Sequence, residues 1–400
     1  MTATTFKTLG RQITFNPEIV APPIIDERLF PRPCSLALDI SGSCNLKCVY
    51  CAENSTMPKR EPMDMKTLNL SVDSIFNWSE NKNGVSIHLG SGEPLLNASL
   101  LRTLDKKARK LASERHQPLS LYLTTNGTLL NNQIIKLLIT GNWNVKISID
   151  GDQATHDRQR KSKTGEGTFL AIQPALSHLV KQMPESFSTT SVLCHGTDPK
   201  DVFYAIASMG VGSIEIVPIA VAKESKFALR QNDFDVYRTF IFEYAQRIAK
   251  GEQLPVNIRF HKRLLKALGY GNSRVPCGAG RTFYAVGPQG DIYPCFRFVG
   301  LSKYRLGDLS GISSERVKWF TASSGRTYDQ RIECQRCWAA SLCGGPCYAC
   351  ADLFGSGSAL ASYCEIVRIE SEAALWLASD LREKNIERLV EFMGIKVQEE

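Results

Sequence analysis

From about residue 36 the chain settles into short apolar stretches that alternate with longer amphipathic ones. In the clearest stretch, Val85, Ile87 and Leu89 alternate with two polar residues, which predicts a half-buried β-strand. Similar stretches predict strands at residues 36–40, 119–124, 145–149, 188–194 and 213–219. Apolar residues at helical spacing predict helices at residues 99–115, 131–140, 167–182 and 199–209.

Strands that alternate with helices of this length are typical of parallel βαβ units. About six such units would form a partial (β/α)6 TIM-like barrel, so the fold class that we predict is α/β. In parallel barrels the chemistry lies at the C-terminal ends of the strands. Polar and cysteine-rich stretches follow several of the predicted strands, which agrees with this arrangement.

The rest of the chain departs from the repeat. Residues 232–270 have helical spacing, and an apolar stripe over residues 366–393 predicts one or two C-terminal helices packed on the core. We therefore expect five parts. They are an irregular N-terminal extension (1–33), the barrel (34–230), a helical bridge (231–276), a small cysteine-rich domain with a β-hairpin (277–366) and a C-terminal helix (367–400).

Three cysteines follow the first predicted strand at C-x3-C-x2-C spacing: Cys44, Cys48 and Cys51. Three thiolates so close together can hold three corners of a [4Fe–4S] cube and leave one iron open for a small molecule. Spacing alone leaves two alternatives, a zinc ion with a distant fourth ligand or three free thiols.

Other motifs near this loop favour a cluster over zinc or free thiols. An aromatic residue, Tyr50, precedes the third cysteine, and residues 90–94 read Gly-Ser-Gly-Glu-Pro. Together these motifs resemble the signature of the radical S-adenosylmethionine (SAM) superfamily, over about residues 36–222. The resemblance implies that the open iron is chelated by SAM, and that one electron from the cluster cleaves SAM to a 5′-deoxyadenosyl radical. The SAM contacts that it implies are Tyr50, Gly90, Ser91, Gly92, Glu93, Asn126, Ser148 and Asp150.

Each of these contacts has a plainer alternative. Residues 90–94 on their own would be an ordinary tight turn, in which glycine supplies the backbone freedom. Ser148 could equally be a buried hydroxyl that bonds to the backbone.

A second set of cysteines begins at Cys277 and reads C-x12-G-x4-C, then C-x2-C-x5-C-x3-C, then Cys364. It resembles the SPASM extension of radical SAM enzymes that modify peptides. The resemblance implies two auxiliary [4Fe–4S] clusters, one on Cys277, Cys295 and Cys347, the other on Cys334, Cys337, Cys343 and Cys364. The fourth ligand of the former is open, and we favour Cys350 over an open iron. A zinc ribbon is the alternative, but so many thiols exceed one tetrahedral site.

Composition adds little beyond this. The 400 residues are 43% hydrophobic and 22% charged, which is typical of a globular protein, and no apolar run is long enough for a membrane span. No secretory signal precedes residue 33, so we expect a cytoplasmic protein, where thirteen cysteines indicate metal or redox chemistry. The net charge of +8 is mild, and basic residues at 106–110 and 158–163 are interpreted as solvated surface rather than a nucleic-acid site.

The function that these features predict is oxidative modification of a ribosomally made precursor peptide, by a carbon–carbon, ether or thioether cross-link. Sulfatase-maturating enzymes carry an aspartate base directly after the cysteine that matches Cys295, whereas this chain has Phe296. Formylglycine formation is therefore disfavoured, and a protein cross-link of the quinohemoprotein type is a related alternative. A nucleotide or small-molecule radical SAM enzyme, or a non-enzymatic electron-transfer protein, are the alternatives from other classes.

No general base stands out in the sequence. The positions that we would test are Glu53, Glu215, Asp291 and Tyr293. The expected partners are the precursor peptide, an electron donor of the flavodoxin or ferredoxin type and, because the first 33 residues are too short for a peptide-recognition domain, a separate recognition protein.

Overall fold

The computed structural model describes residues 4–8, 11–15, 34–51, 60–79, 84–222, 224–271, 274–322, 327–354 and 359–384. One mixed sheet organises most of them, with the strand order β13-β12-β11-β10-β3-β4-β5-β6-β7-β8-β9. Its central strands, from β3 to β9, all run parallel to their neighbours. The predicted α/β class, with a partial parallel barrel, is confirmed.

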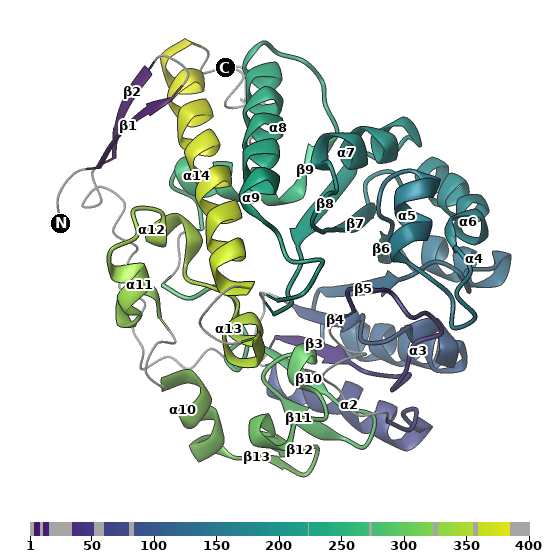
Figure 1. Ribbon diagram of the computed structural model, residues 1–400. Helices are drawn as coiled ribbons and strands as arrows, with labels where there is room; N and C mark the ends of the chain where they lie inside the picture. The colour runs from purple at the N-terminus through teal and green to yellow at the C-terminus, as the bar shows by residue number, and fades with distance from the viewer. Residues whose placement is uncertain are drawn as a thin grey trace, which may run out of the picture.

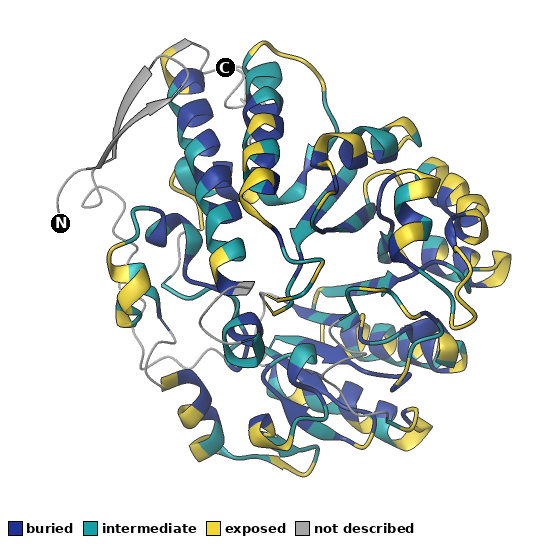
Figure 2. Cartoon of the chain, in the orientation of Figure 1, coloured by how far each residue is buried: buried dark blue, intermediate teal, exposed yellow. Residues whose placement is uncertain are grey.

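Six of the parallel strands, β3 to β8, lie close to their predicted positions, whereas the short strand β9 falls in a stretch that was predicted to be helical. The parallel strands are β3 (Ser35–Leu38), β4 (Val85–Leu89), β5 (Leu119–Thr125), β6 (Asn144–Ser148), β7 (Phe187–Leu193), β8 (Ser213–Pro218) and β9 (Val256–Asn257). The helices between them are α2 (Met65–Trp78), α3 (Ala98–Glu114), α4 (Asn132–Thr140), α5 (Gln153–Gln159), α6 (Phe169–Gln182) and α7 (Pro199–Ser208). They cover the outside of the curved sheet, with their exposed faces outward (Figures 1 and 2).

The alternation in β4 explains which face is which. Val85, Ile87 and Leu89 are almost fully buried, whereas Ser86 and His88 between them are only partly buried. Successive side chains of a strand point to opposite faces, so the apolar face packs against the helices and the polar face lines the barrel interior. There His88 stacks on Tyr122 of β5, with ring centroids 4.4 Å apart.

Residues after 250 return to the same sheet. Strand β10 (Phe283–Val286) pairs in parallel with β3. It continues through the antiparallel strands β11 (Asp291–Tyr293), β12 (Gly307–Asp308) and β13 (Gly311–Ile312). The short helices nearby are η3 (Phe296–Phe298), η4 (Ser302–Tyr304), α10 (Ser314–Ala322), η5 (Tyr328–Gln330), α11 (Ile332–Gln335), α12 (Ala340–Cys343) and α13 (Tyr348–Phe354).

The last described helix, α14 (Ala359–Lys384), packs along α8 (Gln231–Ala249) and α9 (Ile258–Ala267) (Figure 1). Its fully buried Glu370 accepts hydrogen bonds from Tyr237 and, through both carboxylate oxygens, from Arg259. The bridge helices and the predicted C-terminal helix therefore form one packed unit. Residues 385–393 of the predicted stripe lie outside the described residues.

The N-terminal expectation needs a correction. Strands β1 (Thr4–Thr8) and β2 (Arg11–Phe15) form an antiparallel hairpin, where an irregular extension was expected. Both stretches are rich in β-branched and aromatic residues, and Gly10 lies between them, so the signal for a hairpin was present. Among the described helices, none combines the length and apolarity that crossing a membrane requires.

Candidate active site

The three-cysteine loop follows β3 and is fastened along its whole length. The amides of Lys47 and Val49 donate to the carbonyls of Lys161 and Gln159, at 2.8 and 3.0 Å. At the start of the loop, the side-chain amide of Asn126 donates to the Sγ of Cys44, at 3.8 Å, and to Asn45, at 2.8 Å. The loop is thus held by the end of β5 and by the segment after α5.

The three thiols lie within electrostatic reach of one another. Burial raises the pKa of Cys48 to about 12; Arg160 works against this rise, and the charges of Cys51 and Cys44 contribute to it. Burial likewise raises the pKa of Cys44, to which Glu93 and Cys51 contribute. Buried thiols of this kind are protonated on their own, and a bound cation is what makes thiolates of them.

The turn at residues 90–94 packs directly against this loop. Gly92 has a φ of +58°, and a Cβ added there would lie 2.2 Å from the carbonyl oxygen of Ser43. The amide of Glu93 donates to the same oxygen, at 2.9 Å. Only glycine fits this position, because both the backbone conformation and the close approach exclude a side chain.

The side chain of Glu93 is fully buried. It accepts hydrogen bonds from the Thr125 hydroxyl (2.7 Å) and from the amides of Asn126 (2.7 Å) and Leu95 (3.1 Å). The Leu95 contact caps the 3₁₀ helix η2 (Pro94–Asn97). Glu93 therefore braces the turn against the end of β5, although the sequence pattern made it a candidate SAM contact.

Asp150 is also a brace. Its carboxylate accepts two hydrogen bonds from Arg160, at 2.9 and 3.2 Å, one from the Tyr50 hydroxyl at 2.6 Å and one from the amide of Val192 at 3.0 Å. Both side chains of the ion pair are buried, and the guanidinium also lies 5.4 Å from the centroid of the Tyr50 ring. The pair ties the cysteine loop to β6 and β7, and Arg160 does not lie on the solvated surface that the basic run predicted.

A cavity of about 750 Å³ opens beside these elements. Its polar lining includes the three cysteines and Tyr50, together with Gly90, Gly92, Asn126, Ser148, Arg160, Thr124, Thr125 and Thr190. Its apolar lining includes Val192, Val217, Pro218, Ile219, Ala220, Phe296, Leu353 and Phe354, and Arg297 also lines the cavity. None of the described residues that line it is an aspartate or a glutamate.

The residues proposed as bases do not meet at this cavity. Glu215 lies on β8 and pairs with Lys146 of β6 at 2.7 Å; burial works to raise its pKa, but Lys146 makes the net shift downward. Asp291 pairs with Arg305 at 2.7 Å, and Tyr293 is buried on β11. None of these three is among the lining residues, and Glu53 lies outside the described residues.

The other cysteines fall into two groups. Cys277, Cys295, Cys347 and Cys350, which we call the inner group, interact electrostatically with one another. Burial raises the pKa of Cys277 to about 11 and that of Cys295 to about 12. Cys350 donates a hydrogen bond to Cys347, which lowers the pKa of Cys347 and raises that of Cys350. The structure thus places Cys350 with the three cysteines of the first predicted set.

The outer group comprises Cys334, Cys337, Cys343 and Cys364. Burial raises the pKa of Cys334 to about 11 and that of Cys364 to about 12, and the charges of Cys343 and Cys337 act on both. Of the two cysteines left over, Cys194 is buried and Cys34 hydrogen-bonds through its thiol to the carbonyl of Thr282. The described cysteines therefore sort into three groups and two isolated thiols.

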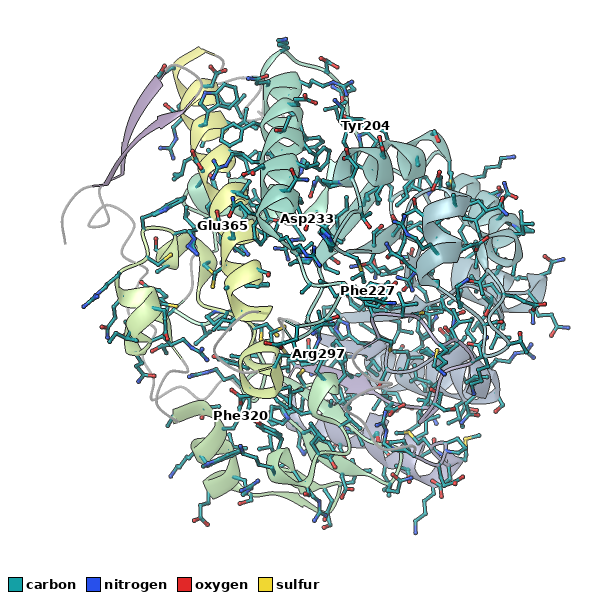
Figure 3. All side chains as sticks on the ribbon, viewed as in Figure 1. Tyr204, Phe227, Asp233, Arg297, Phe320 and Glu365 are labelled. Atoms are coloured by element: carbon teal, nitrogen blue, oxygen red, sulfur yellow. The ribbon has the colours of Figure 1, made fainter. Side chains whose placement is uncertain are left out.

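A further residue joins the cavity to the inner group. Arg297 lies beside α13 in the centre of the view in Figure 3 and is one of the lining residues. Its backbone amide donates to the Sγ of Cys295 at 3.3 Å, and its Nη1 donates to the Sγ of Cys350 at 3.6 Å. The sequence reasoning missed Arg297 and Arg160, because the distance in sequence hid what each side chain reaches.

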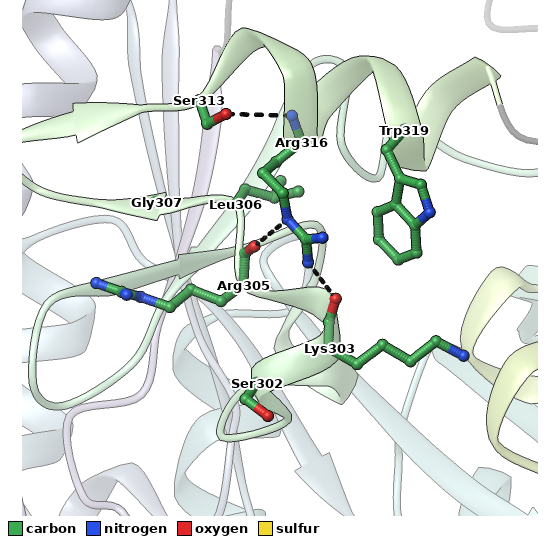
Figure 4. A pocket seen from close by; sticks show the side chains of 8 residues that line it. All are labelled: Ser302, Lys303, Arg305, Leu306, Gly307, Ser313, Arg316 and Trp319. Atoms are coloured by element: carbon green, nitrogen blue, oxygen red, sulfur yellow. Dashed lines mark hydrogen bonds between the residues drawn. The ribbon is translucent and has the colours of Figure 1, made fainter.

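A second hollow lies apart from the cysteines, beside β12 and α10 (Figure 4). It has a volume of about 610 Å³ and is lined by Lys303, Arg305, Arg316 and Trp319, among others. The guanidinium of Arg316 is held by the carbonyls of Arg305 and Lys303 and lies 4.6 Å from the Trp319 ring centroid. Its cations are thus largely engaged in holding the surface together.

The thiol groups suit iron–sulfur clusters in their chemistry. In the described part of the chain, no three His, Cys, Asp or Glu side chains converge on one position for a single metal ion. A cubane does not require such convergence, because each thiolate binds a different iron. The donor sets that fit it are three partly buried thiols beside an open cavity and two sets of four, in which Cys277 is exposed, Cys350 is buried and the others are partly buried.

Comparison with known proteins agrees with the fold and the three-cysteine loop. Residues 38–207 match the model of the Radical SAM superfamily. This part of the chain is a radical SAM domain.

The similarity extends well beyond that domain. The chain is 26% identical over 336 residues to the cysteine-type anaerobic sulfatase-maturating enzyme of Clostridium perfringens (strain 13 / Type A), covering 78% of this chain and 88% of that protein. It is 25% identical over 333 residues to the mycofactocin maturase MftC of Mycolicibacterium smegmatis, covering 81% and 80%. Among solved structures, anSMEcpe with bound AdoMet has a TM-score of 0.73 at 22% identity, covering 88% of this chain and 100% of that one. SuiB of Streptococcus suis has a TM-score of 0.55 at 15% identity, covering 80% and 73%.

Proposed function

We propose that this protein uses SAM to modify a peptide oxidatively, and that the product is a carbon–carbon, ether or thioether cross-link in a ribosomally made precursor. The observation that carries the proposal is the cavity itself. Its lining includes both the three-cysteine loop and Phe296 and Arg297, which directly follow Cys295 of the inner group. A substrate held there would contact the three-cysteine loop and the residues next to the inner group.

The grouping of the cysteines supports three ligand sets. Cys44, Cys48 and Cys51 would hold the cluster that binds SAM, and the inner and outer groups would each hold an auxiliary [4Fe–4S] cluster. Cys350 would complete the inner set. When bound, the first cluster and SAM supply a strongly oxidising 5′-deoxyadenosyl radical, and the auxiliary clusters supply a site for the electron that bond formation releases.

The residues of the chain hold SAM and exclude water. Gly90 and Gly92 let the backbone approach the ligand, and Asn126 and Ser148 offer polar groups to the same cavity. Glu93 and Asp150 do not line the cavity, and their oxygens already accept the hydrogen bonds that fix the turn and the loop, so they are proposed as braces. Tyr50 lines the cavity with its ring, while its hydroxyl is held by Asp150.

The substrate side of the cavity favours a peptide with an apolar residue at the reacting position. Its wall of aliphatic and aromatic side chains suits such a residue, since apolar surface is buried there at a gain of free energy. Relatives also support a peptide: one structure of anSMEcpe contains the Cp18Cys peptide, and one of SuiB contains its precursor peptide SuiA. The electron donor would be of the flavodoxin or ferredoxin type, and a separate protein would recognise the precursor.

A sulfatase-type oxidation is the second candidate, because sulfatase-maturating enzymes are among the relatives. The lining of the cavity disfavours this reaction, because Phe296 follows Cys295 where those enzymes have an aspartate base, and no carboxylate is among the described lining residues. A nucleotide or small polar molecule is the third candidate substrate. It would not fill the apolar part of the cavity.

The test is anaerobic incubation of the reconstituted protein with SAM, a reductant and one candidate substrate at a time. The candidates are the peptide encoded beside the gene, a cysteine- or serine-containing sulfatase peptide, and a nucleotide mixture. A precursor-peptide product lighter by two hydrogens, seen by mass spectrometry, supports the proposal. Formylglycine in the sulfatase peptide, or a modified nucleotide, replaces it.

A further inference from the structure

We propose that Arg297 is a positioning residue that raises the reduction potential of the cluster held by the inner cysteine group. This inference rests on the proposed function, because it requires a cluster on Cys277, Cys295, Cys347 and Cys350. It concerns the reduction potential of that cluster, which the ligands alone do not determine.

The two donors of Arg297 are fixed by the local fold. Cys295 caps the short helix η3, and its Sγ accepts the backbone amide of Arg297 at 3.3 Å. The same residue then sends its side chain to Cys350, with Nη1 3.6 Å from Sγ. One residue thus donates to two sulfur atoms of the group, one from its backbone and one from its side chain.

The positive charge of Arg297 adds to the two hydrogen bonds. The guanidinium lies beside Cys350, with Nη1 3.6 Å from Sγ, and Arg297 directly follows Phe296 after Cys295 in the chain. A full positive charge at this distance stabilises negative charge on the sulfur atoms that it faces.

Hydrogen bonds to sulfur and nearby positive charge favour the more negative, reduced state of an iron–sulfur cluster, so they raise its potential. The outer group has cations of its own: Arg263 and Lys266 lie close to Cys343. A change at Arg297 should consequently alter one auxiliary cluster and leave the other as it was. Because Arg297 also lines the cavity, the cation stands between the substrate space and the inner thiols.

The experiment is an anaerobic redox titration of the full-length, reconstituted protein, followed by electron paramagnetic resonance. We compare wild type with Arg297→Gln, Arg297→Lys and the control Arg316→Gln, whose guanidinium is held by carbonyls beside the second hollow. At the wild-type midpoint of the inner cluster, Arg297→Gln should lower the ratio of reduced to oxidised cluster about tenfold, a shift of about 59 mV for a one-electron couple. Arg297→Lys should fall between, and the other two clusters and the control should keep their potentials.

Two results would overturn the inference. One is an unchanged potential in Arg297→Gln with full iron content, and the other is an equal shift of all three clusters, which indicates a general loosening of the fold. If Arg297→Gln does not retain iron, Arg297→Lys decides, since it keeps the charge but loses the contact of Nη1 with Cys350: a lower potential of one cluster supports the inference, and an unchanged one refutes it. Iron content and SAM cleavage of the wild type, measured first, test the proposed function separately.

Discussion

Replacement of Asp150 by asparagine should destabilise the protein far more than its small change in shape suggests. The substitution removes the negative charge that faces Arg160 and keeps a side chain of nearly the same size. In the ion pair, the Arg160 side chain is 7% exposed and that of Asp150 is 1% exposed, so solvent cannot replace the lost partner. Removing one member of a buried ion pair costs about 3–5 kcal/mol of unfolding free energy.

The neighbouring contacts give the comparison. Tyr50→Phe removes a single hydrogen bond to the same carboxylate, which should cost about 1.5–3 kcal/mol because the acceptor is charged. In the double variant Asp150→Asn/Arg160→Met no charge remains buried, and the amide oxygen still offers an acceptor to Tyr50 or Val192. Replacing a buried ion pair by uncharged residues costs much less than removing one member of it. The double variant should therefore be more stable than Asp150→Asn alone.

The assay is urea unfolding under anaerobic conditions, followed by tryptophan fluorescence, with iron retention measured in parallel. Because Tyr50 lies between Cys48 and Cys51, Asp150→Asn should also lose iron from the three-cysteine loop first. A loss of less than about 1 kcal/mol in Asp150→Asn, or additive losses in the double variant, would refute the reasoning.

Other predictions follow from single contacts. Gly92→Ala should abolish SAM cleavage and lower the yield of folded protein, because its Cβ would lie 2.2 Å from the carbonyl oxygen of Ser43 at a φ of +58°; normal activity would contradict this. Glu93→Gln keeps the acceptor for Thr125 but presents an amide N–H₂ to one of the donors, so a loss of about 1–3 kcal/mol is expected in urea unfolding, and none would count against the brace. Burial lowers the pKa of His88 to about 4, so the unfolded state binds a proton that the native state excludes between about pH 6.5 and 4. Stability should fall as the pH drops through this range, by up to about 1.4 kcal/mol per pH unit from this group, and His88→Phe should flatten the slope; an unchanged slope would refute the role of His88.

The sequence predicted the barrel because its signals are local. Each strand from β4 to β8 begins and ends within about two residues of the expected position. The reason is that alternation and helical spacing depend only on residues that are close together in the sequence. The pairing of β10 with β3 joins residues about 250 positions apart, and no local pattern carries that information. It makes the cysteine-rich segment a continuation of the barrel sheet.

At the site, the sequence indicated which residues gather and not what they touch. Glu93 and Asp150 follow strands, as expected, but only the three-dimensional arrangement shows that Thr125, Asn126 and Arg160 already occupy their oxygens. The sequence predicted a solvated surface for Arg160, because a run of basic residues is usually exposed to solvent. Burial with a specific partner overrode that expectation.

The central claim is that Cys44, Cys48 and Cys51 hold a cluster with one open iron that cleaves SAM. The most direct measurement is the release of 5′-deoxyadenosine from SAM by the anaerobically reduced protein, in wild type and in each Cys→Ala variant of the loop. The account predicts release by the wild type, loaded with about twelve irons for three cubanes, and none by the three variants, which keep about eight. Release by a variant without these thiols, or none by fully loaded wild type, would contradict it.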